Sequence, residues 1–487
     1  MKLKITNFKA ISTTQEFNLD NINIIAGQNS GGKSSLIHAL LFLKQNLEDK
    51  QEELLKFNKP LLSLGQFNDV VSKKVNNGCL SFSFVITKLD LDKSRYSKYF
   101  RDLDFKNAEY RVSFESVRQS IGNNTYIKSI EILITTTSDE TQIVSFTRKR
   151  GNSYHFQVSD NFDDFSVRGE EADLKRGFMV EMNVGNFLVN RTFFYFKTFY
   201  IKIPIVDFIC DVIQTNFQRI NYIGPLREAP KNYYYSEDNG SSIVGTRGEF
   251  TPQFLAKNQN KKNSYYQIDN EGNFSEKIES NIFKSTKYWV CDFFKLASDM
   301  TLDKDSNGVL YQVNFNQRNS SSKVSINNVG FGMSQILPIV VQGMALPTGS
   351  ILILEQPEIH LHPSVQAKLF DFFHALQKKG VSTFVETHSD HLITRLRRRV
   401  AESEGNLENL LTLIFVEYSE SELKTVYNKL QLNDLGNFTY WPEGFFDQYD
   451  NDIRAILKAQ IVKKKKERAG RVKKTLTDQQ SKDEEYS

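Results

Sequence analysis

Apolar residues fall into short runs near the N-terminus and along the stretch that follows it. Residues 3–8 alternate between apolar and polar, and residues 22–26 are mostly apolar. Strand-length apolar runs separated by polar turns then recur, at 80–86, 110–114, 130–134 and 142–146. These patterns predict two strands at the N-terminus and a β-meander after them.

The second half of the chain alternates strand-like and helix-like runs. Residues 351–354 are continuously apolar, which is typical of parallel strands buried on both faces, and 381–386 predict a second buried strand. Apolar residues at helical spacing predict helices, at 34–55, 277–296, 336–344 and 364–378. Residues 311–315 and 323–326 predict a hairpin. Strands and helices in alternation predict an α/β fold with a mixed sheet.

We expect one α/β domain divided by insertions. Residues 1–80 and 301–457 are its two parts. Between them, residues 81–218 predict a β-rich lobe with an aromatic helical insertion, and residues 219–300 predict a polar, mobile surface insertion (233–273) and a helix. Residues 458–487 predict a basic, disordered tail.

Composition is that of an ordinary globular protein, with 39% hydrophobic and 25% charged residues. No apolar run approaches the roughly 18 residues of a membrane span, and the N-terminus lacks the apolar region of a signal peptide, so we expect a cytoplasmic protein. Cys79, Cys210 and Cys291 lie far apart, which argues against a disulfide framework or a thiolate metal site.

The formal net charge of +4 is unevenly distributed. Residues 454–474 hold ten Lys and Arg against one acid, a local charge of +9, so the rest of the chain is about −5. A basic arm of this kind can bind nucleic acid or an acidic partner, and it can equally be a solvated tail.

Residues 27–34 fit the pattern GxxxxGK[ST] between a strand-like run and a helix-like run. Glycines let consecutive backbone N–H groups turn inward around phosphate oxygens, and the helix N-terminus adds partial positive charge. Lys33 is expected to reach the β- and γ-phosphates of ATP, and Ser34 to bind Mg²⁺. The expected nucleotide-binding residues here are Gly27, Asn29, Ser30, Gly31, Gly32, Lys33, Ser34 and Ser35.

Two later strands carry polar residues to the same edge of the predicted sheet. Glu355 ends the apolar run 351–354, which is the arrangement of a Walker B acid that holds Mg²⁺ through its water shell. His388 follows the run 381–386. A histidine at that strand end can contact the γ-phosphate and sense its presence.

Taken in order, four motifs and two further segments resemble one class of ATPase. They are the loop GQNSGGKSS (27–35), NVGFGMSQ (328–335), ILILEQPEIHLHP (351–363) and FVETHSD (384–390), with YIGPLRE (222–228) and YWPEGFFDQ (440–448). The chain is similar to the ABC-type ATPase heads of the OLD, RecF and SMC class, and within it to prokaryotic AAA-type ATPases of anti-phage defence. The resemblance covers residues 1–457, and the middle lobes match in general character only.

The resemblance implies further roles. Gly330, Gly332 and Ser334 resemble the signature motif, which reaches across a head-to-head dimer to the nucleotide of the partner. Gln66 resembles the Q-loop glutamine that contacts Mg²⁺ and the attacking water. Residues 360–363 resemble the D-loop. Their HxH spacing also allows a metal pair, although turn-forming contacts across the dimer are the favoured interpretation.

Gln356 departs from the class, in which many members carry a second acid there as catalytic base. An amide orients water but cannot take its proton, so slow hydrolysis and a switch-like ATPase are expected. The predicted catalytic residues are Glu355, Gln356 and His388, with Glu358 as a substitute base.

Three functions follow from these observations. The first is a nucleotide-gated regulatory ATPase with a separately encoded effector such as a nuclease, because no nuclease motif follows His388. The alternative is a RecF- or SMC-like ATPase that binds DNA in repair or chromosome maintenance, through the basic tail and Arg395, Arg397, Arg398 and Arg399. A scaffold with negligible hydrolysis is the third, and it depends on Gln356 alone.

Overall fold

The computed structural model shows two compact units, Met1–Thr439 and Tyr440–Ser487. It describes residues 1–28, 31–48, 54–58, 61–72, 78–88, 90, 104–118, 123–162, 166–168, 177–181, 187–189, 194–196, 199–231, 234–235, 244–269, 271–304, 310–317, 323–328, 330–403, 407–442, 445 and 451–467. Asn29 and Ser30, predicted to bind nucleotide, lie outside the described residues, as does most of the WPEGFF segment.

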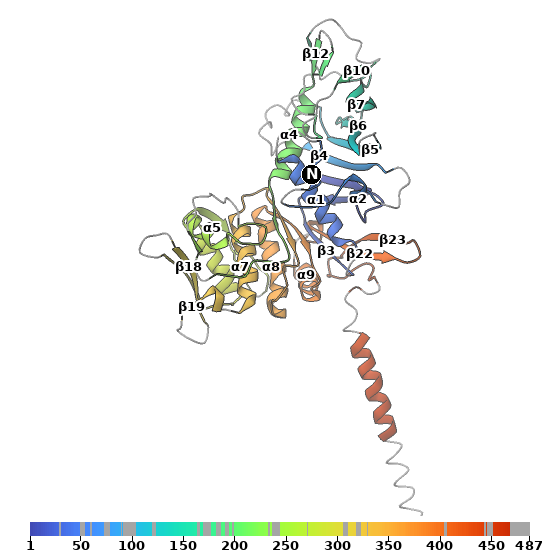
Figure 1. Ribbon diagram of the computed structural model, residues 1–487. Coiled ribbons are helices and arrows are strands. Elements are labelled where there is room, and N and C mark those ends of the chain that lie inside the picture. The colour runs from blue at the N-terminus through green and yellow to red at the C-terminus, as the bar shows by residue number, and fades with distance from the viewer. Residues whose placement is uncertain are drawn as a thin grey trace, which may run out of the picture. The chain divides into compact units, whose positions relative to one another are not determined.

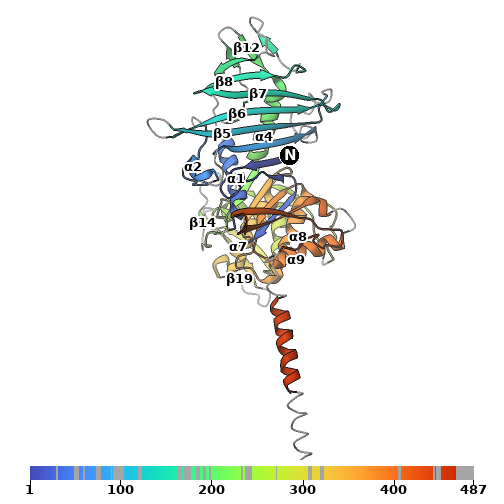
Figure 2. The same cartoon turned by 90° about the vertical axis from the view of Figure 1, so that its right-hand side faces the viewer.

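Eight described strands form an antiparallel sheet, with the order β10-β8-β7-β6-β5-β4-β1-β2 (Figure 2). Their bounds are β1 Lys2–Thr6, β2 Gln15–Asn18, β4 Leu80–Thr87, β5 Asn107–Arg118, β6 Asn123–Thr135, β7 Thr141–Arg150, β8 Ser153–Val158 and β10 Phe178–Glu181. The sheet contains the predicted meander, and the first predicted strand pairs with it. Alternate side chains such as Phe82 and Phe84 are buried, as one covered face requires.

A second sheet is mainly parallel, with the order β13-β20-β21-β3-β22-β23, in which only β23 runs antiparallel to its neighbour. Its strands are β3 Ile22–Gly27, β13 Ile220–Ile223, β20 Ile351–Glu355, β21 Ser382–Glu386, β22 Leu411–Ser419 and β23 Lys424–Leu430. All residues of β20 and β21 are buried. This sheet confirms the predicted α/β class with a mixed sheet.

Helices cover the parallel sheet and join it to the antiparallel one. The longer ones in Met1–Thr439 are α1 Lys33–Leu47, α4 Pro204–Gln218, α7 Phe331–Ala345, α8 Pro363–Lys379 and α9 Asp390–Glu402 (Figure 1). One hydrophobic core runs from α1 into both sheets, with Phe42 of α1 against Phe8 and Phe82. None of the helices in the described part of the chain is long and apolar enough to cross a bilayer.

Two of the predicted helices differ from the helices that the structure shows. The helix predicted at 34–55 ends at Leu47, where Asn46 accepts a hydrogen bond from the backbone of Lys56 and the chain turns back. The helix predicted at 277–296 begins as a strand, β16 (Ile278–Asn281), and the polar insertion 233–273 contains ordered elements where it is described. The predicted hairpin is formed by β18 (Leu310–Asn316) and β19 (Lys323–Ser325).

The remaining elements are short. They are α2 Phe67–Val70, β9 Ser166–Arg168, β11 Phe194–Phe196, β12 Phe199–Lys202, β14 Tyr234–Tyr235, α5 Thr251–Asn258, β15 Lys262–Tyr265, β16 Ile278–Asn281, α6 Ile282–Lys287, the π-helical turn Tyr288–Phe293, β17 Asp299–Lys304, β18 Leu310–Asn316, β19 Lys323–Ser325 and the 3₁₀ turns Ile326–Asn328 and Leu407–Leu410. In the second unit, residues 451–467 form a helix, so the boundary predicted at 457 falls inside a regular element.

Candidate phosphate and metal site

The phosphate loop begins where β3 passes close to β22. Gly27 has φ +143°, and a Cβ there would lie 2.0 Å from the carbonyl oxygen of Val416. Gly32 has φ +105°, and a Cβ there would lie 2.8 Å from the Cβ of Ala10. Both positions therefore require glycine for conformation and for space. The loop delivers the chain to α1, whose first residue is Lys33.

Lys33 is 3% exposed and folds back onto the loop. Its Nζ donates to the carbonyl oxygens of Gly27 at 3.1 Å and Gln28 at 2.5 Å. Burial lowers the pKa of Lys33, and the nearby Glu386 carboxylate opposes that shift. No side chain caps the N-terminus of α1. A buried cation beside a helix N-terminus without a side-chain cap is an arrangement that can bind phosphate.

Two carboxylates meet at the carboxyl ends of β20 and β21. Glu355 and Glu386 are directly paired in the parallel register, and Ile25 of β3 lies beside Glu386. The Ser34 hydroxyl donates to Glu386, 3.0 Å from Oε2 and 3.3 Å from Oε1. The phenolic hydroxyl of Tyr222 donates to Glu355 Oε1 at 2.8 Å. The hydroxyl predicted to bind Mg²⁺ thus contacts Glu386, which the sequence interpretation left without a role.

Burial disfavours the charged forms of these acids. Burial and the neighbouring Glu355 carboxylate raise the pKa of Glu386 to about 7. Burial also raises the pKa of Glu355, against the hydrogen bond from Tyr222 and the charge of Arg227. Two adjacent carboxylates and a hydroxyl fit Mg²⁺, which keeps several waters and takes one or two carboxylates together with phosphate oxygens. Among the described residues, no cluster of three or more His, Cys, Asp and Glu side chains is placed to hold a metal ion by itself.

Gln356 lies at the turn that follows β20, with φ +45°. Its N–H donates to the Glu386 carbonyl oxygen at 2.8 Å, and its own carbonyl oxygen accepts from Arg227 at 3.2 Å. Arg227 also donates to the carbonyl oxygen of Glu355 at 3.0 Å. These bonds hold a non-glycine residue in the left-handed region, which signals a constrained site.

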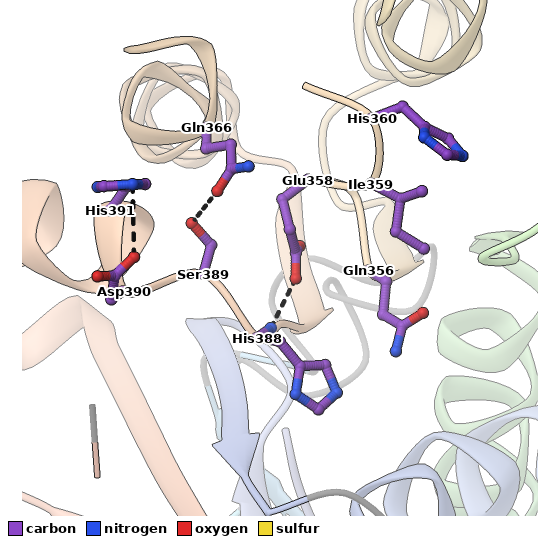
Figure 3. A pocket seen from close by; sticks show the side chains of 9 residues that line it. All are labelled: Gln356, Glu358, Ile359, His360, Gln366, His388, Ser389, Asp390 and His391. Carbon is purple, nitrogen blue, oxygen red and sulfur yellow. Dashed lines mark hydrogen bonds and ion pairs between the residues drawn. The ribbon is translucent and has the colours of Figure 1, made fainter. Parts of the chain in front are cut away.

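His388 and Glu358 are joined across the same edge of the sheet. The backbone N–H of His388 donates to Glu358 Oε1 at 2.6 Å, and Figure 3 shows this contact. The second oxygen of Glu358 is buried and has no hydrogen-bond partner among the described residues. Burial raises the pKa of Glu358. Burial and the charge of Lys33 lower the pKa of His388, which favours the neutral imidazole.

Two cavities open at this edge and share Gln356 and His388. The first, of about 490 Å³, is the phosphate cavity, lined by Lys9, Gly32, Lys33, Ser34, Ser35, His38, Gln356, Glu386 and His388. The second, of about 580 Å³, is lined by Gln356, Glu358, Ile359, His360, Gln366, His388, Ser389, Asp390 and His391 (Figure 3). The predicted residues Lys33, Ser34, Ser35, Gln356 and His388 therefore lie together.

Lys9 and His38 also line the phosphate cavity, and the sequence interpretation missed both. Lys9 Nζ is 2.9 Å from Nδ1 of His38. Burial, with the charge of Lys9, lowers the pKa of His38 to about 4, so the imidazole is neutral at pH 7 and accepts this hydrogen bond. None of the described carboxylates forms an ion pair with Lys9. A cation without an acidic partner in this cavity favours an anionic ligand.

Other predicted residues lie away from the phosphate cavity. Gln66 is exposed at the start of α2, where its backbone N–H donates to Asp69, and it lines neither cavity. Gly330 precedes α7 and is open on its surface, whereas Ser334 is buried within α7. A Cβ on Gly332 would lie 3.2 Å from the carbonyl oxygen of His360, so the signature-like and D-loop-like segments are neighbours.

The HxH pair serves the start of α8. His362 Nδ1 is 2.9 Å from the Ser364 hydroxyl and accepts from the Ser364 N–H at 3.3 Å, which makes His362 the N-cap of α8. His360 has φ +61° in the preceding turn. This geometry agrees with the turn interpretation of the pair.

The arginines of α9 are engaged within the protein. Arg395 and Arg399 both bind Asp371, which is fully buried. Arg397 donates to the carbonyl oxygen of Gly436, and Arg398 pairs with Glu402. Arg395 and Arg399 are therefore used within the protein, whereas Arg398 is exposed, and DNA binding through this helix stays a prediction.

Comparison with known proteins completes this description. Residues 1–393 match the model of the family described as AAA ATPase domain, and residues 413–456 match a family described as a protein of unknown function, DUF3696. A search of curated proteins finds no match.

Solved structures of SMC heads align with the chain at low identity. An SMC head bound to the C-winged helix domain of ScpA shows 10% identity, a TM-score of 0.40 and coverage of 88% of this chain and 98% of that one. The SMC head domain from Thermotoga maritima shows 9% identity, a TM-score of 0.37 and coverage of 88% of this chain and 98% of that one. A third structure is an SMC head domain with an extended coiled coil, bound to the C-terminal domain of ScpA derived from Pyrococcus furiosus. It shows 9% identity, a TM-score of 0.38 and coverage of 88% of this chain and 96% of that one. The family assignment does not rest on these distant likenesses.

Proposed function

The chain belongs to the AAA ATPase domain family, and we propose that it binds ATP with Mg²⁺ in the phosphate cavity and hydrolyses it slowly. One observation supports this proposal most directly. Lys33, Ser34 and Glu386 line the same cavity as Gln356, and the Ser34 hydroxyl donates to Glu386. Lys33 would exchange the loop carbonyl oxygens for β- and γ-phosphate oxygens, and Lys9 would add a second positive charge.

Ser34, Glu355 and Glu386 are the residues that would hold Mg²⁺, directly or through its waters. When bound, Mg²⁺ neutralises charge on the phosphate oxygens. Its charge also favours the ionised form of Glu386, whose pKa is raised in the protein alone.

Slow hydrolysis follows from the groups around the attacking water. Gln356 can orient a water molecule by hydrogen bonds. His388 is neutral because burial and the charge of Lys33 lower its pKa, and its ring N–H can donate to a phosphate oxygen. An amide cannot take a proton, and burial together with the charge of Lys33 weakens His388 as a base. Glu358 is the nearest candidate base by sequence, and it is one of the residues that line the second cavity.

We further propose that the ATPase works as a nucleotide-gated regulatory subunit in anti-phage defence, with a separate effector such as a nuclease. Support comes from the motif resemblance and from the core that α1 shares with the antiparallel sheet. A head-to-head dimer would place Gly330, Gly332 and Ser334 of one copy at the nucleotide of the other.

The alternative, a DNA-binding ATPase of RecF or SMC type, is favoured by one observation. Residues 451–467 form an exposed helix that carries Arg454, Lys458 and Lys463 to Lys466. Duplex DNA binding that weakens steeply with salt, together with faster phosphate release in the presence of DNA, would support this alternative.

The proposed function is tested with Lys33→Ala. We expect the wild-type protein to bind a fluorescent ATP analogue and to release phosphate at a slow, Mg²⁺-dependent rate, and Lys33→Ala to weaken binding at least tenfold, since it removes a charged hydrogen-bond donor. Equal binding by the two proteins would refute the nucleotide site. Binding without any phosphate release above the Lys33→Ala background would leave the scaffold function.

A further inference from the structure

Two side chains of the YIGPLRE segment support the end of β20 from outside the phosphate cavity. Tyr222 lies on β13, which runs parallel to β20 with Tyr222 opposite Ile353. Its hydroxyl reaches Glu355 Oε1 at 2.8 Å. Arg227 follows β13, is 7% exposed, and donates to the carbonyl oxygens of both Glu355 and Gln356. Neither side chain is among the residues that line the two cavities described above, so we do not expect either to touch the nucleotide.

The backbone at Gln356 needs such support because its φ of +45° is unfavourable for a residue with a Cβ. The Gln356 carbonyl oxygen accepts from Arg227 and from the N–H of Ile359 at 3.3 Å, while its N–H is bound to Glu386. Arg227 thus ties two successive carbonyl groups on either side of the strained residue. The side chain of Gln356 is then held where both cavities can use it, pointing away from Glu358 in Figure 3.

Charge reinforces this geometry. Arg227 is buried close to Glu355 and Glu358, and it is the cation that favours their ionised forms. A guanidinium presents two parallel N–H donors in a fixed plane, which a lysine ammonium cannot reproduce.

We infer that Tyr222 and Arg227 are positioning residues of the ATPase site: Arg227 fixes the turn that aims Gln356 at the phosphate cavity, and Tyr222 orients the Glu355 carboxylate. The inference rests on the proposed ATPase function.

Tyr222→Phe removes one hydroxyl. We expect Mn²⁺ binding to the ATP-bound protein, measured by electron paramagnetic resonance, to weaken about tenfold, in keeping with a lost hydrogen bond to a charged group, and ATP binding in EDTA to stay unchanged. The matched control is Tyr288→Phe, which loses a hydrogen bond to the backbone of Ile268 elsewhere. Unchanged Mn²⁺ affinity in Tyr222→Phe would overturn the role given to this residue.

Arg227→Met and Arg227→Lys test the turn. We expect both to bind ATP within about twofold of wild type but to release phosphate, and to trap ADP with fluoroaluminate, about tenfold less well. In a Gln356→Ala background the same substitutions should add no further loss, because Arg227 acts through Gln356. The matched control is Arg148→Met, which loses a partly buried pair with Glu115 on the antiparallel sheet.

Each outcome bears on a different claim. Wild-type behaviour of Arg227→Lys would show that charge alone suffices and would refute the role in positioning. Additive losses in the Gln356→Ala background would also refute it. If Arg227→Met does not fold, Arg227→Lys decides the question. A wild-type protein that binds ATP no better than Lys33→Ala would instead refute the proposed function itself.

Discussion

Gln356 sets the expected pace of the reaction because its amide stands where an acid would take the proton of water. The turn after β20 places Gln356 in the lining of both cavities. We expect Gln356→Glu to raise the rate of phosphate release about tenfold or more at saturating ATP, since general bases contribute factors of that size. Glu355→Gln is the control, and it should lower the rate. An unchanged rate in Gln356→Glu would mean that another step limits turnover.

Glu386 makes the stability of the metal-free protein depend on pH. Its pKa is about 7 in the folded protein and returns to an ordinary carboxylate value on unfolding. Between these two values the folded protein binds more protons, so rising pH lowers the free energy of unfolding. We expect the stability of wild type relative to Glu386→Gln to fall by at most about 3 kcal/mol from pH 5 to pH 8.

This comparison is made by denaturation in EDTA without nucleotide. Taking the difference between the two proteins removes the contribution of other titrating groups, such as His38 and His374, whose lowered pKa values act in the opposite direction. A difference that stays constant with pH would contradict the assignment.

The predicted site residues that lie at the phosphate cavity carry local signals in the sequence. Lys33 and Ser34 follow the glycines of a loop, and Gln356 and His388 follow buried strands. Glu386 was missed because its contact with Ser34 depends on β21 lying beside β3, an order that the sequence does not state. Lys9 was missed for a similar reason, since it reaches the cavity only through tertiary packing against α1.

The loop between β3 and α1 leaves no room for a side chain at Gly27. A methyl group at Gly27 would meet the backbone of Val416, and neither strand can yield without losing its pairing. We expect Gly27→Ala to lower the free energy of unfolding by more than about 2 kcal/mol, through clash and the unfavourable φ together. Gly78→Ala is the matched control, because a Cβ there makes an ordinary 3.5 Å contact with Val71. Equal denaturation midpoints for the two variants would contradict this account.

Element predictions succeeded where hydrophobic pattern and local burial agree. The runs at 351–354 and 381–386 became β20 and β21, and the meander became the antiparallel sheet. Errors arose where tertiary contacts override a local pattern. Asn46 and Gln45 bind the backbone of Lys56 and end the helix early, and β15 recruits the start of the segment 277–296 as its partner.

At the scale of the whole molecule, the proposed dimer can be tested through one glycine. Gly330 is exposed, has no atom within 4 Å of where a Cβ would lie, and adopts φ −49°, so a larger residue fits its own chain. The neighbouring contact between Gly332 and His360 makes the signature-like and D-loop-like segments parts of one surface. An arginine at position 330 would project from that surface and obstruct a second copy.

We expect wild-type protein to double in mass with ATP and Mg²⁺ and to remain a monomer without them, as measured by light scattering after size exclusion. Gly330→Arg should stay monomeric and still bind ATP with wild-type affinity, because the phosphate cavity belongs to its own chain. Gly78→Arg, exposed at a distant point of the sequence, should dimerise normally. Dimerisation of Gly330→Arg would exclude this surface from the interface, whereas loss of ATP binding in the same variant would show that position 330 contributes to its own nucleotide site.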